Sequence, residues 1–153
     1  MTSCHQEKKS QFSIKGTTKE LKNGTVLYLF DTSKEEIIDS VKVQNNKFDF
    51  STNLKNYPFP AVLRNKDNSL YKRLWLENKP MIFNASNRNF ENAEILGSDS
   101  EIEYDNLYKA VDTLSRKESK KLLTNFIKTN FDNILGSYVL SEWYISWKKE
   151  RTE

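Results

Sequence analysis

Hydrophobic and polar residues alternate over the first two-thirds of the chain, in short runs separated by turn-forming residues. Alternation of this kind predicts β-strands with one buried face. The runs that we predict as strands are 12–17, 25–30, 37–43, 47–51, 60–64, 70–76, 81–85 and 93–97. No crossover helix of a parallel α/β fold fits between them. We therefore expect an antiparallel β-sandwich or open barrel of about eight strands over residues 12–97.

Asparagine-containing turns separate two pairs of these strands. Asn23-Gly24 indicates a tight turn. Asn45-Asn46 can adopt positive φ at modest cost, so we expect strands 37–43 and 47–51 to pair as one hairpin. The residues expected on its buried face are Val41, Val43, Phe48 and Phe50.

The hydrophobic period becomes helical after Gly97, which predicts a C-terminal α-helical segment of two to three helices over residues 98–153. Ser98 and Ser100 each precede a glutamate by three residues, as in a capping box. The hydrophobic stripes of the first and second helices are separated by a charged break at 116–121. A third helix is predicted from 134 to about 149, capped by Asp132 or Asn133. Residues 1–11 are expected to be a flexible tether.

The predicted third helix is hydrophobic around more of its circumference than one core-facing stripe requires. One interpretation is that its aromatic residues pack against the sheet and the other helices. The other is that they bind a second domain or chain, because aromatic residues are enriched at interfaces. The residues concerned are Trp143, Tyr144 and Trp147.

Composition excludes several classes of protein. Of the 153 residues 29% are charged, and lysines and glutamates are interleaved, so that the net charge is only +3. Binding to nucleic acid, which needs basic side chains gathered on one face, is disfavoured. No run of residues approaches the roughly 20 apolar residues that cross a bilayer.

The residue types of common catalytic and metal sites are scarce. The chain has one histidine, His5, and one cysteine, Cys4, which are neighbours near the N-terminus and provide neither a nucleophilic triad nor a zinc ligand set. Its four glycines are isolated, so no phosphate-binding loop is indicated. We expect no catalytic function, no cofactor and no metal, although two carboxylates that meet only in space would allow a hydrolase.

Some acidic and aromatic residues could belong to a ligand site, but each of them also has a structural explanation. The acidic residues at 99–105 suit the first turns of a helix better than a calcium loop. Glu35, Glu36 and Asp39 are expected on an edge strand, where charges oppose further pairing. Tyr71 and Trp75 are candidates for stacking on a sugar ring, with packing on the sheet as the alternative.

Cys4 is placed where a lipid attachment site is found in bacterial lipoproteins, with the small residues Thr2 and Ser3 before it and a polar segment after it. We expect Cys4 to carry a lipid that anchors the protein to a membrane. No hydrophobic signal region precedes it in this sequence. The two interpretations are that an export signal has been removed, or that the protein is cytosolic.

The order of several motifs resembles a known family. Phe12-Ser13-Ile14-Lys15-Gly16 and the segments 21–29, 38–50, 75–78 and 95–98 resemble the DUF4369-type domain, a domain of unknown function. This domain stands at the N-terminus of thiol-disulfide interchange (TlpA/ResA-like) lipoproteins of Bacteroidota. Asn46, Lys79 and Phe131 replace residues usual in the family. The segment 126–140 resembles the stretch that directly precedes the family's thioredoxin-like domain.

The resemblance implies a lipid-anchored, periplasm-facing cell-envelope protein. The CxxC motif of the family's oxidoreductase domain is absent from the sequence, so the resemblance implies no oxidoreductase activity for this chain. The leading hypothesis is an accessory module that binds a thioredoxin-like domain in cis or in trans. The alternative is a periplasmic sandwich that binds a peptide or glycan.

Overall fold

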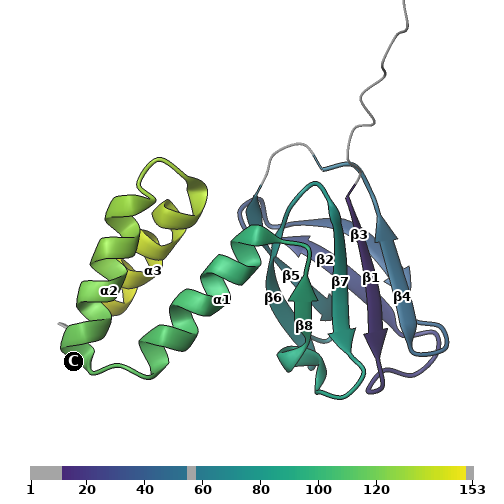
Figure 1. Cartoon of the computed structure of the whole chain (residues 1–153). Helices are drawn as coiled ribbons and strands as arrows, with labels where there is room; N and C mark the ends of the chain where they lie inside the picture. Colours follow the sequence, from purple (N-terminus) through teal and green to yellow (C-terminus); the bar gives the residue numbers. More distant parts are fainter. Residues whose placement is uncertain (1–11, 55–57, 151–153) are drawn as a thin grey trace, which may run out of the picture. The chain divides into compact units, whose positions relative to one another are not determined.

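The structure is a computed structural model that describes residues 12–54 and 58–150, with side chains as far as Ser146 (Figure 1). The chain divides after Ser98 into a β-sheet unit and a helical unit. Cys4, His5 and the predicted tether 1–11 lie outside the described residues. No helix among the described residues is long and apolar enough to span a membrane.

The first unit contains two four-stranded sheets, which confirms the β-sandwich, one of the two architectures predicted from the sequence (Figure 1). Sheet A has the order β4-β1-β7-β8, and sheet B has the order β3-β2-β5-β6. One pairing differs from the prediction, because β1 and β7 are parallel while the other pairs are antiparallel. The strands are β1 (Ser13–Thr18), β2 (Val26–Asp31), β3 (Glu36–Lys42), β4 (Lys47–Ser51), β5 (Phe59–Asn65), β6 (Tyr71–Leu76), β7 (Pro80–Ala85) and β8 (Glu94–Leu96).

The prediction that β3 and β4 form one hairpin is wrong, although the turn between them is as expected. Asn45 and Asn46 have φ angles of 50° and 63°, and the backbones of Gln44 and Lys47 pair across the turn. The two strands then separate, because β3 pairs with β2 in sheet B and β4 pairs with β1 in sheet A. The turn therefore carries the chain from one sheet to the other.

Inward-facing side chains of the two sheets form one hydrophobic core. The burial alternates along β2 and β4, as the sequence predicted. Four phenylalanines lie at its centre, with ring centroids 5.9 Å apart for Phe48 and Phe50, 5.3 Å for Phe48 and Phe83, and 4.8 Å for Phe83 and Phe90. Phe90 begins a short 3₁₀ helix, Phe90–Asn92, between β7 and β8.

The second unit consists of α1 (Asp99–Asp112), α2 (Arg116–Thr129) and α3 (Ile134–Glu150). The expected charged break at 116–121 is wrong, because these residues are the first turns of α2. Ser115 and Glu118 form a capping box there, and the charged side chains lie on the exposed face of a helix that they favour energetically. Asn133 accepts a hydrogen bond from the Gly136 amide at 2.9 Å, so Asn133 rather than Asp132 caps α3.

Candidate functional site

The two aromatic residues predicted to bind a ligand lie on the same strand but differ in exposure. Tyr71 and Trp75 occupy outward-facing positions of β6, opposite in direction to the core residues Leu74 and Leu76. The Tyr71 side chain is 44% exposed, whereas Trp75 is 2% exposed. In this structure only Tyr71 is therefore accessible to a ligand.

Strand pairing brings two further side chains beside Tyr71. Arg64 of β5 is directly opposite Tyr71 of β6 and, on its other side, opposite Tyr28 of β2. The neighbouring positions Leu27, Leu29 and Leu63 are buried in the core, so Tyr28, Arg64 and Tyr71 all face outward from sheet B. We call these three residues the tyrosine–arginine row.

The Arg64 guanidinium is held by its surroundings. Its carbon lies 5.1 Å from the centroid of the Phe30 ring, a cation–π contact. Its Nη1 atom donates a hydrogen bond to Oδ1 of the Asn68 side chain at 2.7 Å. A side chain that is fixed in this way loses less conformational freedom on binding a ligand.

A shallow depression of about 570 Å³ adjoins Tyr28. Asp67, on its rim, accepts hydrogen bonds from the hydroxyl and amide of Ser69 at 2.8 and 3.1 Å. These hydrogen bonds lower the pKa of the Asp67 carboxyl, which is therefore an ionised acceptor at neutral pH. The residues that line the depression are Thr25, Val26, Tyr28, Asn65, Lys66 and Asp67.

The sequence reasoning missed Tyr28 and Arg64. Each lies at an outward position of a correctly predicted strand, so alternation alone identified the face on which it lies. Their proximity to Tyr71 depends on the strand order of sheet B, which the sequence did not reveal.

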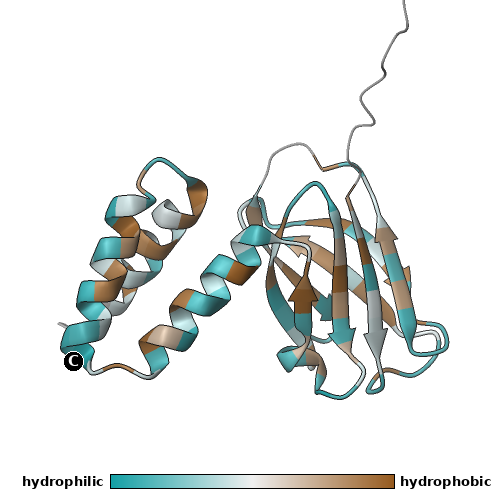
Figure 2. Ribbon diagram, in the orientation of Figure 1, coloured by the Kyte–Doolittle hydropathy of each residue, from teal (hydrophilic) through white to brown (hydrophobic). Residues whose placement is uncertain are grey.

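The predicted partner-binding residues lie on α3. The Lys120 ammonium of α2 is 5.9 Å from the centroid of the half-buried Trp143 ring. Tyr144 is 53% exposed, and the side chain of Trp147 lies outside the described residues. Figure 2 shows hydrophobic residues along α3, and the structure adds the exposed Leu140 and Ile145 to this surface.

A polar contact joins α1 to α3. The Glu142 carboxylate accepts hydrogen bonds from the hydroxyls of Tyr104 and Tyr108 at 2.9 and 2.8 Å. Burial and the Glu142 charge raise the pKa of Tyr104, and burial and the Glu142 hydrogen bond raise the pKa of Tyr108. Both phenols are therefore neutral donors at physiological pH, and the contact stabilises the helix packing.

We expect Glu142→Ala to lower the free energy of unfolding of the helical unit by about 1 kcal/mol, because two half-buried hydroxyls lose their acceptor. Thermal unfolding followed by circular dichroism at 222 nm measures this loss.

Because the pKa values of Tyr104 and Tyr108 are both raised in the folded state, the stabilisation from their contact with Glu142 is present below pH 10.0, the ordinary pKa of tyrosine, and is lost as the pH rises above it. Equal alkaline sensitivity of wild type and a Tyr104→Phe/Tyr108→Phe variant would contradict this role.

The acidic residues of 99–105 and of β3 do not form a metal site in the described part of the chain. Among the residues that the structure describes, no group of three or more His, Cys, Asp or Glu side chains is placed to hold a metal ion. Glu35, Glu36 and Asp39 lie at or beside β3, an edge strand of sheet B, as predicted.

Comparison with protein families identifies the family to which the β-sheet unit belongs. A family model described as a domain of unknown function (DUF4369) matches residues 12–104. The chain belongs to the DUF4369 family. No curated protein and no solved structure matches it. The family predicted from the sequence motifs is thus confirmed.

The DUF4369 match separates the two groups of candidate residues. It includes both sheets, and with them the tyrosine–arginine row, and it ends at Tyr104 within α1. Helices α2 and α3, which carry the predicted partner-binding residues, lie beyond the DUF4369 match. The two groups therefore belong to different parts of the chain and require separate tests.

Proposed function

We propose that this DUF4369 chain is a non-catalytic interaction module of a lipid-anchored cell-envelope protein, in which α3 binds a thioredoxin-like domain in cis or in trans. The observation that carries the proposal is the exposed hydrophobic surface of α3. Leu140 and Tyr144, one helical turn apart, are 45% and 53% exposed, and Ile145 is 66% exposed. Adjacent exposed hydrophobic residues are typical of protein–protein contact surfaces.

The expected lipid anchor at Cys4 supplies the cellular context of the proposal. The genomic reading frame tests it directly. Codons for a hydrophobic signal segment that ends at Cys4 would support export and lipid attachment, whereas a reading frame without such a segment would contradict both. Codons downstream of Glu153 that encode a thioredoxin-like domain would indicate that α3 binds a domain of the same polypeptide, in cis.

For binding in trans, we expect the purified chain to capture thioredoxin-like proteins from a cell-envelope extract. The double variant Leu140→Ser/Tyr144→Ser should reduce the captured amount at least about fivefold, because it removes the hydrophobic surface without disturbing the buried Leu135 and Val139. Mass spectrometry of the captured proteins, searched for a CxxC-containing thioredoxin fold, is the measurement.

Phe131→Ser is the matched control, because Phe131 is 76% exposed but lies between α2 and α3 rather than on α3. This control should capture as much as the wild type. The absence of thioredoxin-like proteins from the wild-type sample would contradict binding in trans. Equal capture by the double variant would exclude α3 as the contact surface.

A further inference from the structure

Basic side chains gather on the outer face of sheet B, and the acidic Asp67 lies in the depression at its border. Side chains at alternate positions of three adjacent strands face outward there, and their charged members are all cations. Lys42 at the end of β3 and Lys66 just after β5 add two more, both exposed. The outward positions are Val26, Tyr28 and Phe30 of β2, Pro60, Val62 and Arg64 of β5, and Tyr71, Arg73 and Trp75 of β6. An anionic ligand fits this face by charge complementarity.

The tyrosine–arginine row gives the ligand a more definite chemistry. Neighbouring strands are about 4.8 Å apart, so Tyr28 and Tyr71 lie about 10 Å apart with Arg64 between them. Arginine carries five N–H donors in a planar fork that matches a carboxylate. Within the part of the chain that the structure describes, Asn68 accepts a hydrogen bond from Nη1 of Arg64, and the other donors of the fork can face a ligand. A carboxylate flanked by two sugar rings therefore fits the row in charge and spacing.

Two details favour a sugar chain over a nucleic acid. Stacked bases need free aromatic faces at successive positions, but the Arg64 guanidinium covers the Phe30 ring next to Tyr28. Asp67 in the adjoining depression is a carboxylate acceptor for hydroxyl donors, which are plentiful on a saccharide and scarce on a nucleic-acid backbone.

We propose that the outer face of sheet B binds an acidic saccharide, with a uronate carboxylate on Arg64 and sugar rings against Tyr28 and Tyr71. Arg73 and Lys66 are the cations nearest along the strands for further acidic groups. This inference goes beyond the proposed function, because it concerns the DUF4369 region and not α3. Either can fail without the other.

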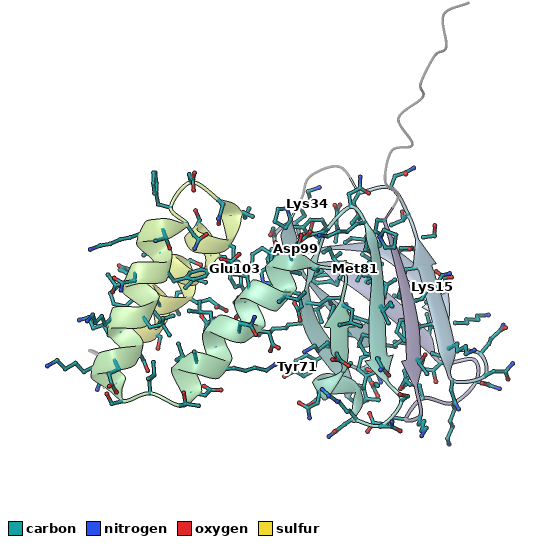
Figure 3. The ribbon with its side chains drawn as sticks, in the orientation of Figure 1. Lys15, Lys34, Tyr71, Met81, Asp99 and Glu103 are labelled. Atoms are coloured by element: carbon teal, nitrogen blue, oxygen red, sulfur yellow. The ribbon has the colours of Figure 1, made fainter. Side chains whose placement is uncertain are left out.

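Calorimetric titration of the full chain with tetragalacturonate at low ionic strength tests the proposal. We expect measurable binding, and no binding of a neutral galactose tetrasaccharide. Tyr71→Ala and Arg64→Gln should each weaken binding about tenfold, since each removes one contact of ordinary size for a sugar site. Lys15→Ala is the matched control, because it removes an exposed cation from the outer face of sheet A (Figure 3) and should bind as the wild type does.

Tyr71 is exposed, so Tyr71→Ala retains the fold and a loss of binding reports the contact itself. The absence of tetragalacturonate binding would overturn the proposal. Equal binding of the neutral tetrasaccharide, or wild-type affinity in both variants, would also overturn it. Tighter binding of single-stranded oligothymidylate than of tetragalacturonate would also overturn the proposal, because it would show that this face prefers a nucleic acid to a saccharide.

Discussion

Replacing Phe83 with alanine is expected to lower the free energy of unfolding of the β-sheet unit by about 3–5 kcal/mol. Phe83 is fully buried, and its ring lies between those of Phe48 and Phe90, at centroid distances of 5.3 and 4.8 Å. Alanine leaves a cavity that the two sheets cannot close without moving their backbones. A domain of this size is stable by only about 5–15 kcal/mol, so a loss of this size unfolds a measurable fraction of the molecules.

Hydrogen exchange read by peptide mass spectrometry is the suitable measurement, because it reports the two units separately. Peptides from 12–98 should lose protection, while peptides from α2 and α3 should exchange as in the wild type. Phe131→Ala, which truncates an exposed phenylalanine outside the sheets, should change stability by less than about 0.5 kcal/mol. A Phe83→Ala protein with wild-type protection in β1 and β7 would show that the core does not depend on this ring.

The positions of the strands could be predicted from the sequence, but their partners could not. Alternation identified all eight strands to within about two residues, because the side-chain period of a strand directly reflects burial on one face. Pairing is a property of the whole fold. Asn45 and Asn46 formed the expected turn, yet that turn joins two sheets, and β1 pairs in parallel with β7, more than 60 residues away.

The same limit applies to the candidate ligand site. Tyr71 and Trp75 were chosen because they lie on one predicted strand, and the structure leaves only Tyr71 exposed. Its neighbours in space, Arg64 and Tyr28, come from strands that are 7 and 43 residues away in sequence. A local pattern carries information on which face a residue occupies, but no information on which residue lies across the sheet from it.

In the helical unit, the interpretation of 116–121 as a break gave too much weight to charge. Lysine and glutamate have high helix propensity, and an exposed helix face accepts them without cost. The informative signal was Ser115 followed by Glu118, which together form the capping box observed at the start of α2.

Replacing Gly16 with alanine is expected to destabilise the β-sheet unit by about 2–3 kcal/mol, because the new methyl group overpacks the core. Gly16 faces inward from β1, opposite Phe48 of β4, and a Cβ there would overlap the Phe48 ring. Its φ is not positive, so in open space alanine would instead stabilise the strand by about 0.4–1 kcal/mol. The sign of the change in the free energy of unfolding, measured with denaturant, therefore decides the matter. A loss shows that the Phe48 ring is fixed against β1, and a gain shows that the ring can move away.

Two further variants separate this steric effect from a backbone effect. Gly24 has a φ of 87° and no atom within 4 Å of an added Cβ, so Gly24→Ala should cost only the strain of a left-handed residue, about 1 kcal/mol. In a Phe48→Ala background the overlap at Gly16 disappears, and Gly16→Ala should then be neutral or stabilising. A double-mutant cycle that gives additive losses would refute the contact. A coupling as large as the loss from Gly16→Ala itself would show that glycine is required in β1 because Phe48 of β4 occupies the space of its side chain.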